Sequence, residues 1–389
     1  MFSSRTDWHR RPNLLNQLVE QLRREGKPFS DLTISNPTEC GIQYPAELIS
    51  ALARPESLRY LPGPKGLLSA RTAVASYYRE KDIRINPEHI VLTASTSEAY
   101  SMVFRLLCEP GDEVLVPVPS YPLFEFLARL NDVVIRPYQL RYDGEWHADI
   151  GSASQVLASR TKAIIAVSPH NPTGMFLKKP ELAALSSIAG ANGLALVVDE
   201  VFADYGFDGD AGRVVSVAAG SIALTFTLNG ISKLAGLPQM KLGWIVVSGP
   251  ADLRDEALGR LEIIADTYLS VNTPVQNALP QLLEYGRGIR EQIRQRTAEN
   301  AATARRLVPA NSTCTLLNSE GGWYAILQVP RTRTGEEWSI GLLKDERVYV
   351  HPGYFFDFES DNVLVLSLLP EPHQFEDSVR RTIKYISGH

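Results

Sequence analysis

Short, mostly apolar runs alternate along the first two thirds of the chain with longer segments in which apolar residues recur every three to four positions. Each run has the length of a buried strand. Runs of this kind lie at 90–92, 113–117, 133–137, 163–167, 194–198, 223–228 and 244–247. The segments before and between them, for example 68–80 and 181–190, have helical spacing. Strands that alternate with helices are typical of a mostly parallel sheet with helices on its faces.

The pattern changes after residue 249. Two long helical segments, 251–270 and 275–307, come first, and the second is rich in Arg and Glu, which is typical of a solvated helix face. Strand-like runs and a closing helix follow at 324–329, 347–351, 363–369 and 375–386. This succession predicts an α+β unit separate from the parallel sheet. The 389 residues are enough for two domains.

The composition is that of an ordinary soluble globular protein, with 44% hydrophobic and 21% charged residues. A net charge of −5 gives no support for nucleic-acid binding, which needs a basic face. The sequence contains no run of 18 apolar residues, so we expect no membrane span. The N-terminal segment contains charged residues such as Arg5 and Asp7 before any apolar stretch, which does not resemble a signal peptide. Cys40, Cys108 and Cys314 are far apart, which favours neither disulfides nor a metal site and indicates a reducing compartment such as the cytoplasm.

One lysine has unusual neighbours. Lys233 lies between two predicted core strands, in the segment Ser-Lys-x-x-Gly-Leu-Pro-x-x-Lys-x-Gly that begins at Ser232. For an arbitrary lysine, a surface loop is the usual explanation. A lysine is almost never fully buried unless it is paired or chemically used, so its place between core strands makes Lys233 a candidate catalytic residue.

Polar residues directly follow several predicted strands. Asn171, Asp199 and Lys233 each come just past a strand end. Ligands of parallel sheets bind at the carboxyl ends of the strands, so we expect these side chains to converge. Ordinary alternatives exist, because Asn-Pro-Thr-Gly at 171–174 also occurs by chance and Asp199 could cap a helix or lie in a surface turn.

Three hydroxyl residues, Ser95, Thr96 and Ser97, begin a predicted helix that runs to about residue 108. The exposed amides of a helix start can be capped by such hydroxyls or can bind a phosphate, so both interpretations stay open. Tyr121 lies in Pro-Ser-Tyr-Pro at the expected start of the next helix. Tyr60 lies in a turn-rich segment before residue 68, where it would by itself be a half-buried core tyrosine.

The order of these motifs resembles that of the class I/II aminotransferases, which are fold type I pyridoxal-phosphate enzymes. The similarity extends from Tyr60 to the C-terminus, and the ordered set is far more specific than any single fragment. It implies the α/β pyridoxal-phosphate-dependent transferase fold. The large domain, residues 46–284, would then contain a mostly parallel seven-stranded sheet flanked by helices. Residues 1–45 and 285–389 would form a smaller α+β domain.

The resemblance also implies roles for single residues. Lys233 would form a Schiff base with pyridoxal 5′-phosphate and would then carry a proton between substrate and cofactor as a general base and acid. Asp199 would keep the pyridine nitrogen protonated. Asn171 would hydrogen-bond the ring hydroxyl oxygen, and Tyr121 would stack on the ring.

The cofactor phosphate would be bound by hydroxyls and one cation. The residues implied are Ser95, Thr96, Ser97, Ser232 and Lys241. Tyr60 would reach the phosphate of the neighbouring subunit, which implies a homodimer. The implied substrates are an amino acid and a 2-oxo acid.

Four positions depart from the family pattern. Gly230 stands where a phosphate-binding serine is usual, and Lys241 replaces an arginine, giving a point charge for a two-pronged fork. Phe202 replaces the tyrosine that donates to the ring hydroxyl oxygen, although Tyr205 lies close by in the sequence. Val365 stands where an arginine binds the substrate α-carboxylate.

Valine cannot donate a hydrogen bond, so another group must hold the carboxylate, or the substrate lacks a carboxylate at that place. Asn36 and the backbone around Ser35 lie in a polar loop of the matching region and are our candidates. The departures leave a lyase, decarboxylase or cyclase with the same cofactor as an alternative. A sensor domain of a gene regulator is disfavoured, because no basic helix-turn-helix pattern precedes residue 30. A Ser-Lys hydrolase is also disfavoured, because the side chains of the adjacent residues Ser232 and Lys233 would point apart.

Overall fold

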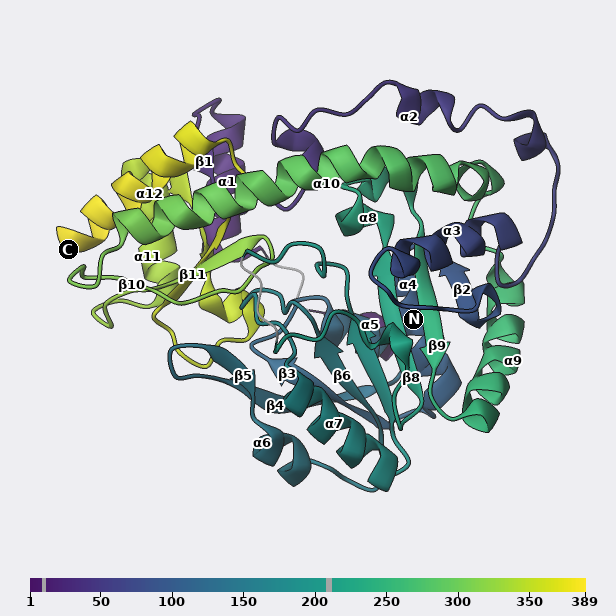
Figure 1. Cartoon of the computed structure of the whole chain (residues 1–389). Coiled ribbons are helices and arrows are strands. Elements are labelled where there is room, and N and C mark those ends of the chain that lie inside the picture. Colours follow the sequence, from purple (N-terminus) through teal and green to yellow (C-terminus); the bar gives the residue numbers. More distant parts are fainter. Residues whose placement is uncertain (9–11, 208–211) are drawn as a thin grey trace.

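The structure, a computed structural model, describes residues 1–8, 12–207 and 212–389 of the chain (Figure 1). The strands of its central sheet are β2 (Ile90–Thr93), β3 (Glu113–Val118), β4 (Val134–Tyr142), β5 (Trp146–Ala148), β6 (Thr161–Val167), β7 (Ala195–Asp199), β8 (Thr225–Gly230) and β9 (Gly243–Ser248). Within the described ranges the spatial order is β2-β9-β8-β7-β6-β3-β4-β5. We call this sheet and the helices on its faces the large unit.

Most of the central sheet is parallel. β4, β3, β6, β7 and β8 run in one direction, β9 is antiparallel to β8 and β2, and β5 is antiparallel to β4. The α/β prediction is confirmed, but within the described residues the central sheet has eight strands where seven were expected. The additional strand is β5, which pairs with the end of β4 from Leu140↔Ala148 to Tyr142↔Trp146. The apolar pattern did not reveal it, because β5 has three residues and pairs with a partly polar strand end.

Helices cover both faces of this sheet, because successive side chains of a strand point to opposite sides. In β7, Ala195 and Val197 belong to one apolar cluster, while Leu196 and Val198 belong to another. The first cluster contains residues of α4 (Thr96–Leu107), α5 (Phe124–Leu130) and α9 (Ala251–Tyr268). The second contains residues of α3 (Leu68–Arg79), α6 (Ile150–Gln155), α7 (Lys179–Ala191), α8 (Ile231–Leu234) and α10 (Thr273–Leu307).

A second, antiparallel sheet lies toward the C-terminus, and we call it and its helices the small unit. Its strands, in spatial order, are β10 (Thr315–Leu316), β11 (Tyr324–Gln328), β14 (Val363–Ser367) and β13 (His351–Pro352). Helices α11 (Gly335–Gly341) and α12 (Pro372–Ser387) share an apolar cluster with this sheet. The predicted α+β unit is therefore present.

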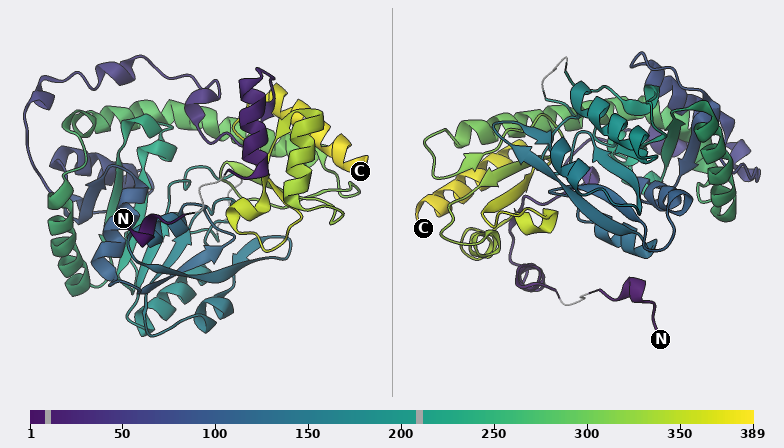
Figure 2. Two further views of the ribbon diagram at one scale, coloured as in Figure 1. Left: turned by 180° about the vertical axis from the view of Figure 1, so that it is seen from behind. Right: turned by 90° about the horizontal axis from the view of Figure 1, so that it is seen from below.

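The N-terminal segment joins the small unit. β1 (Ser30–Asp31) pairs in parallel with β12 (Val348–Tyr349), and α1 (Leu14–Arg24) packs on α11. The left view of Figure 2 shows the purple α1 beside the C-terminal elements. The segment from α1 to β1 thus joins the C-terminal part of the chain, as the division into 1–45 with 285–389 requires, whereas Ser4 and Arg5 contact Arg129 and Asp132 of the large unit. The boundary itself stays a prediction, since α10 runs through residues 284 and 285 as one helix.

Long elements agree with the pattern-based prediction, whereas short ones escape it. The helices expected at 251–270 and 275–307 are present as α9 and α10. The strand expected at 347–351 is divided into β12 and β13, because its two halves pair with different partners. The four-residue α2 (Glu47–Ser50) is too short for a helical period. Among the residues described, no helix combines the length and the apolar character that a membrane crossing needs.

Candidate active site

A cleft of about 810 Å³, part of it open to solvent, lies at the carboxyl ends of β6, β7 and β8. Ser35 and Tyr324 of the small unit line it together with residues of the large unit. Most of the residues that the sequence singled out lie here: Thr96, Ser97, Tyr121, Asn171, Asp199, Ser232 and Lys233. The expected convergence at the strand ends is therefore confirmed for Asn171, Asp199 and Lys233.

Lys233 lies in α8, a single turn that begins where β8 ends. Its Nζ is 3.4 Å from the backbone oxygen of Ser35 and 4.7 Å from the centre of the Trp323 ring. Burial lowers the pKa of Lys233 to about 8, and the Asp199 carboxylate opposes this shift. Part of the lysine population is therefore a neutral amine near neutral pH, as nucleophilic attack and proton transfer require.

Asp199 is the last residue of β7 and is buried. Its carboxylate accepts hydrogen bonds from the Tyr100 hydroxyl at 3.2 Å and from the Val201 backbone at 3.0 Å. Burial raises the pKa of Asp199 to about 6, although these two donors and Lys233 act in the opposite direction. A buried acid with a raised pKa at the base of a cleft is suited to pair with a protonated ligand nitrogen.

Asn171 lies in the loop after β6 and is 8% exposed. Its Oδ1 is buried and has no hydrogen-bond partner within the described ranges. A buried amide atom without a partner costs free energy, so a ligand that supplied the partner would be stabilised here. Tyr121 is 36% exposed at the cleft and lies three residues before α5, in the turn that leads to it rather than at the helix start as expected.

The hydroxyls that the sequence assigned to a phosphate lie at two chain turns. Thr96 and Ser97 begin α4 and line the cleft, as does Ser232 of α8. Ser95 is the N-cap of α4, and its Oγ accepts from the Glu98 backbone at 3.1 Å, so capping occupies this hydroxyl. The positive end of a twelve-residue helix therefore points toward the cleft beside three hydroxyl residues.

Besides Ser95, three of the predicted site residues lie outside the lining of the cleft. Lys241 is exposed in the turn just before Leu242, which does line the cleft. Tyr60 is 73% exposed, which a residue serving another subunit requires but does not by itself establish. Asn36 directs its Oδ1 to Thr38, accepting from the backbone at 3.2 Å and from the hydroxyl at 2.8 Å. The roles of all three stay predictions.

Two departures from the family pattern have a structural explanation. A Cβ atom on Gly230 would lie 2.9 Å from the Gly243 Cα atom and 3.0 Å from the Leu242 oxygen, so the approach of β9 leaves no room for a serine. Tyr205 is fully buried, and its hydroxyl donates to the Lys233 backbone oxygen at 2.6 Å. It supports the chain at Lys233 and does not replace the hydroxyl that Phe202 lacks.

Val365 faces the cleft side of β14 but is buried. Its cross-strand neighbours are Ile326 and His351, and it packs in the apolar cluster shared with the large unit. Tyr324 and Ser35 line the cleft from the small unit and both carry a hydroxyl. Burial raises the pKa of Tyr324, and a hydrogen bond with Ser35 opposes the shift, so the phenol is a neutral donor.

The sequence did not point to Tyr324, Trp323 or Tyr100 as site residues. A Gly-Gly pair followed by two aromatic residues at the start of a predicted strand was the only available signal for Trp323 and Tyr324. Tyr100 lies inside a helix, where an aromatic residue is normally interpreted as part of the hydrophobic core.

Fold and cleft together define a pyridoxal-phosphate-type α/β transferase, and comparison with known proteins gives the family. The family model "Aminotransferase class I and II" matches residues 31–366. The chain therefore belongs to the class I/II aminotransferases and is an aminotransferase. Members of this family use pyridoxal phosphate and act on amino acids and 2-oxo acids, which favours transamination over lyase, decarboxylase or cyclase chemistry.

Individual relatives are distant but similar over almost their whole length. Glutamate-pyruvate aminotransferase AlaA of Haemophilus influenzae is 28% identical over 378 residues, covering 95% of this chain and 93% of the relative. Alanine aminotransferase of Mycobacterium tuberculosis is 26% identical and covers 96% and 89%. The crystal structure of an Escherichia coli aminotransferase superposes with a TM-score of 0.88 at 26% identity, over 100% of this chain and 98% of that one.

The cleft fits the cofactor of this family. A partly neutral lysine, a buried acid, an amide with an unpartnered oxygen and the hydroxyls at the start of α4 match the aldehyde, ring nitrogen, ring hydroxyl and phosphate of pyridoxal phosphate in kind. By contrast, no group of three metal-ligating side chains occurs among the residues described.

Proposed function

We propose that this aminotransferase binds pyridoxal 5′-phosphate through Lys233, Asp199 and Asn171. The observation that carries the proposal is that all three line one cleft while burial shifts the pKa of both titratable groups. Perturbed groups gathered in a cleft are characteristic of functional sites. When bound, the cofactor supplies a carbonyl carbon that takes an amine and a ring that accepts electrons from the substrate α-carbon.

Asp199 would act on the ring nitrogen. Burial disfavours its charged form, so a cationic nitrogen beside it would restore the carboxylate. The carboxylate in turn keeps that nitrogen protonated. Tyr100, which donates to Asp199 at 3.2 Å, orients the acid toward the cleft.

Lys233 would bond covalently to the cofactor and afterwards move a proton. With a pKa of about 8 its amine is partly neutral near neutral pH, so it can take a proton at the substrate α-carbon and return it at the cofactor carbon. The backbone oxygen of Ser35, 3.4 Å from Nζ, and the Tyr205 hydroxyl on the Lys233 carbonyl keep the side chain at the cleft.

The phosphate would lie at the start of α4. Thr96 and Ser97, together with Ser232, offer hydroxyls there, Ser95 caps the same helix end, and Lys241 would swing in from the adjacent turn. Tyr121 would stack on the ring. We further propose a homodimer in which Tyr60 of each copy reaches the phosphate in the other.

The substrate pair would be an amino acid and a 2-oxo acid. Since Val365 cannot hold a carboxylate, we propose neutral donors in its place, with Asn36 and the backbone amides around Ser35 as first candidates. The names of the similar proteins make alanine, glutamate and pyruvate the first compounds to test. The free cysteines Cys40, Cys108 and Cys314 support a reducing compartment, and we propose the cytoplasm.

Borohydride reduction followed by peptide mapping tests the assignment. We expect the cofactor to be fixed on Lys233, and Lys233→Ala to fold but to lose turnover. A label on Lys241 or Lys65 would refute it.

Assays of amino acids against pyruvate and 2-oxoglutarate then define the substrate. Asn36→Ala should raise KM for the amino acid with unchanged cofactor affinity. If Asn36→Ala has no effect and simple amines are better donors than amino acids, a substrate without an α-carboxylate is indicated instead.

A further inference from the structure

A loop of the small unit brings an aromatic ring to Lys233. The loop comprises residues 319–322, between β10 and β11, and Trp323 follows it directly. The centre of the Trp323 ring is 4.7 Å from Lys233 Nζ, whereas that of Phe202 is 5.7 Å away. The indole is 1% exposed and contacts Phe202 and Tyr205 edge to face. The nearest aromatic surface to the Lys233 amine therefore comes from the small unit.

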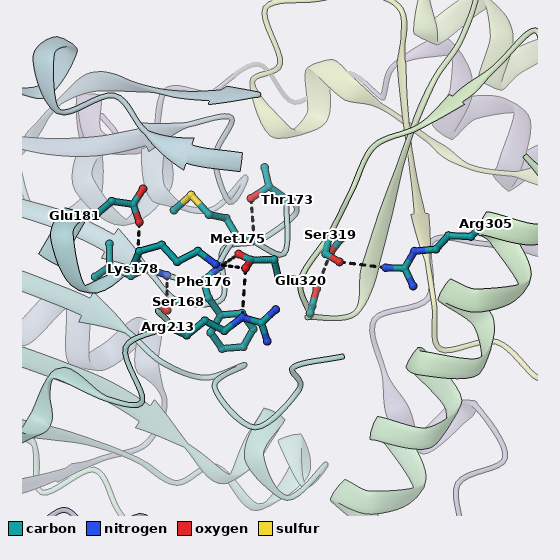
Figure 3. Close-up of polar contacts among 12 residues, drawn as sticks. Ser168, Thr173, Met175, Phe176, Lys178, Glu181, Arg213, Arg305, Ser319 and Glu320 are labelled. Atoms are coloured by element: carbon teal, nitrogen blue, oxygen red, sulfur yellow. Dashed lines mark hydrogen bonds and ion pairs between the residues drawn. The ribbon is translucent and has the colours of Figure 1, made fainter. Parts of the chain in front are cut away.

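Glu320 fastens this loop to the large unit (Figure 3). One carboxylate oxygen pairs with Lys178 and lies 3.2 Å from Arg213 Nε, and the other accepts from the Phe176 backbone at 2.9 Å. The three partners belong to the large unit. The Glu320 side chain is only 17% exposed, and ion pairs shielded from water are weakened little by salt.

Backbone contacts continue the attachment on both sides of Glu320. The Phe207 amide donates to the Glu320 oxygen at 2.9 Å, and the Gly322 amide donates to the Tyr205 oxygen at 2.8 Å. A Cβ atom on Gly321 would lie 2.4 Å from the Tyr205 oxygen, so the two backbone segments touch without intervening side chains. Tyr205 is itself bonded to the Lys233 carbonyl, which makes one continuous path from Glu320 to the lysine.

We propose that Glu320 is a positioning residue for the catalytic lysine: its ion pairs hold the 319–322 loop on the large unit and thereby hold the Trp323 ring against the Lys233 ammonium. An aromatic face attracts a cation, and most strongly where water is excluded. The Trp323 ring thus contacts the charged Lys233 amine whenever that amine is not bonded to the cofactor. This contact opposes the destabilisation of the charged amine by burial. The inference rests on the proposed role of Lys233, but every contact is present in the protein without cofactor.

Titration of Lys233 in the cofactor-free protein tests this inference. A small amine-directed reagent is applied at a series of pH values, and the rate of Lys233 modification is read by peptide mass spectrometry. Trp323→Leu should lower the midpoint by about one pH unit, because a desolvated cation–π contact is lost. Glu320→Ala should lower it in the same direction by about half as much. The double variant should match Trp323→Leu alone, since Glu320 acts through the ring.

Two further variants separate positioning from a general loss of stability. Glu320→Gln keeps the size of the side chain and an acceptor for the Phe176 amide, so an intermediate midpoint is expected. Glu371→Ala is the matched control, because it removes the ion pair with Arg296 at 3.1 Å, which lies outside the 319–322 loop. It should lower the melting temperature at most and leave the midpoint unchanged.

The inference is overturned if folded Glu320→Ala titrates like the wild type, if Trp323→Leu leaves the midpoint unchanged, or if the effects of Glu320→Ala and Trp323→Leu add in the double variant. Failure of the proposed function has a different signature, namely a wild-type protein that takes up no pyridoxal phosphate. The midpoints are measured without cofactor and therefore report on Glu320 in either case.

Discussion

At the scale of the residue, the burial of Lys233 lowers the stability of the fold. Its pKa is lowered from 10.5 to about 8, so below pH 8 the folded protein holds a charge that its surroundings disfavour. The unfolded chain has no such penalty. The penalty is fully present below pH 8 and disappears as the pH rises from 8 through 10.5.

Lys233→Met should therefore stabilise the cofactor-free protein at neutral pH, by roughly 1–3 kcal/mol after allowance for the partial exposure of the side chain. The gain should shrink toward pH 10.5. Urea unfolding at several pH values measures it. A gain that does not depend on pH would contradict the burial argument. Lys65→Met is the control, because it removes the ion pair that Lys65 forms with Glu88 and leaves Lys233 in place.

The replacement of arginine by Lys241 leads to a second residue-scale prediction. A charged hydrogen bond contributes about 1.5–3 kcal/mol, so Lys241→Ala should weaken cofactor binding roughly 10- to 100-fold. Lys241→Arg should bind at least as tightly as the wild type, because a guanidinium donates two parallel bonds to a phosphate. Equilibrium titration of the cofactor-free protein gives both values. An unchanged affinity in Lys241→Ala would show that the side chain keeps its exposed orientation.

At the scale of the element, the close approach of β8 and β9 fixes the turn that carries Lys233. Gly230 pairs directly with Gly243, and a Cβ atom on Gly230 would lie 2.9 Å from the Gly243 Cα atom. Gly230→Ser, which restores the residue usual in the family, should destabilise the fold by about 1–3 kcal/mol through overpacking.

Thermal unfolding measures this effect. Gly259→Ser in α9 is the matched control, because no atom lies within 4 Å of an added Cβ there and serine favours a helix more than glycine does. It should be neutral or slightly stabilising. A Gly230→Ser variant as stable as the wild type would show that β9 can move away.

At the scale of the whole molecule, the exposed segment that leads into the start of α3 suggests an assembly. Leu58 is 93% exposed, Tyr60 73% and Leu68 56%, an apolar group that a partner subunit would cover.

Tyr60→Phe should weaken cofactor binding by about 0.5–1.5 kcal/mol, the contribution of one hydrogen bond. Sedimentation and cofactor titration test both points. Tyr354→Phe, at an exposed tyrosine of the small unit, should leave the affinity unchanged, and a monomer with full activity would refute the shared site.

The sequence could predict whatever follows from local periodicity. Buried strands such as β6 and β7 carry unbroken apolar runs, and α9 and α10 extend over many turns, so each was predicted within a few residues of its observed bounds. β5, β10 and α2 have two to four residues and depend on their neighbours, so no local pattern marks them. For the same reason the 347–351 segment was predicted as one strand, although its halves pair with β1 and β14.

The order of the sequence motifs by itself predicted the class of this protein. The apolar strands before Lys233, Asp199 and Asn171 predicted that these three side chains converge, because the strand ends of a parallel sheet meet. Tertiary structure alone decided the burial that shifts the pKa of Lys233 and Asp199 and the use of the Tyr205 hydroxyl on a backbone oxygen. It also brought Trp323, ninety positions further along the chain, to the lysine. The Trp323 contact arises only when the small unit packs on the large one, whereas the Tyr205 contact joins two segments of the large unit. No local pattern of residues carries information about contacts between distant segments.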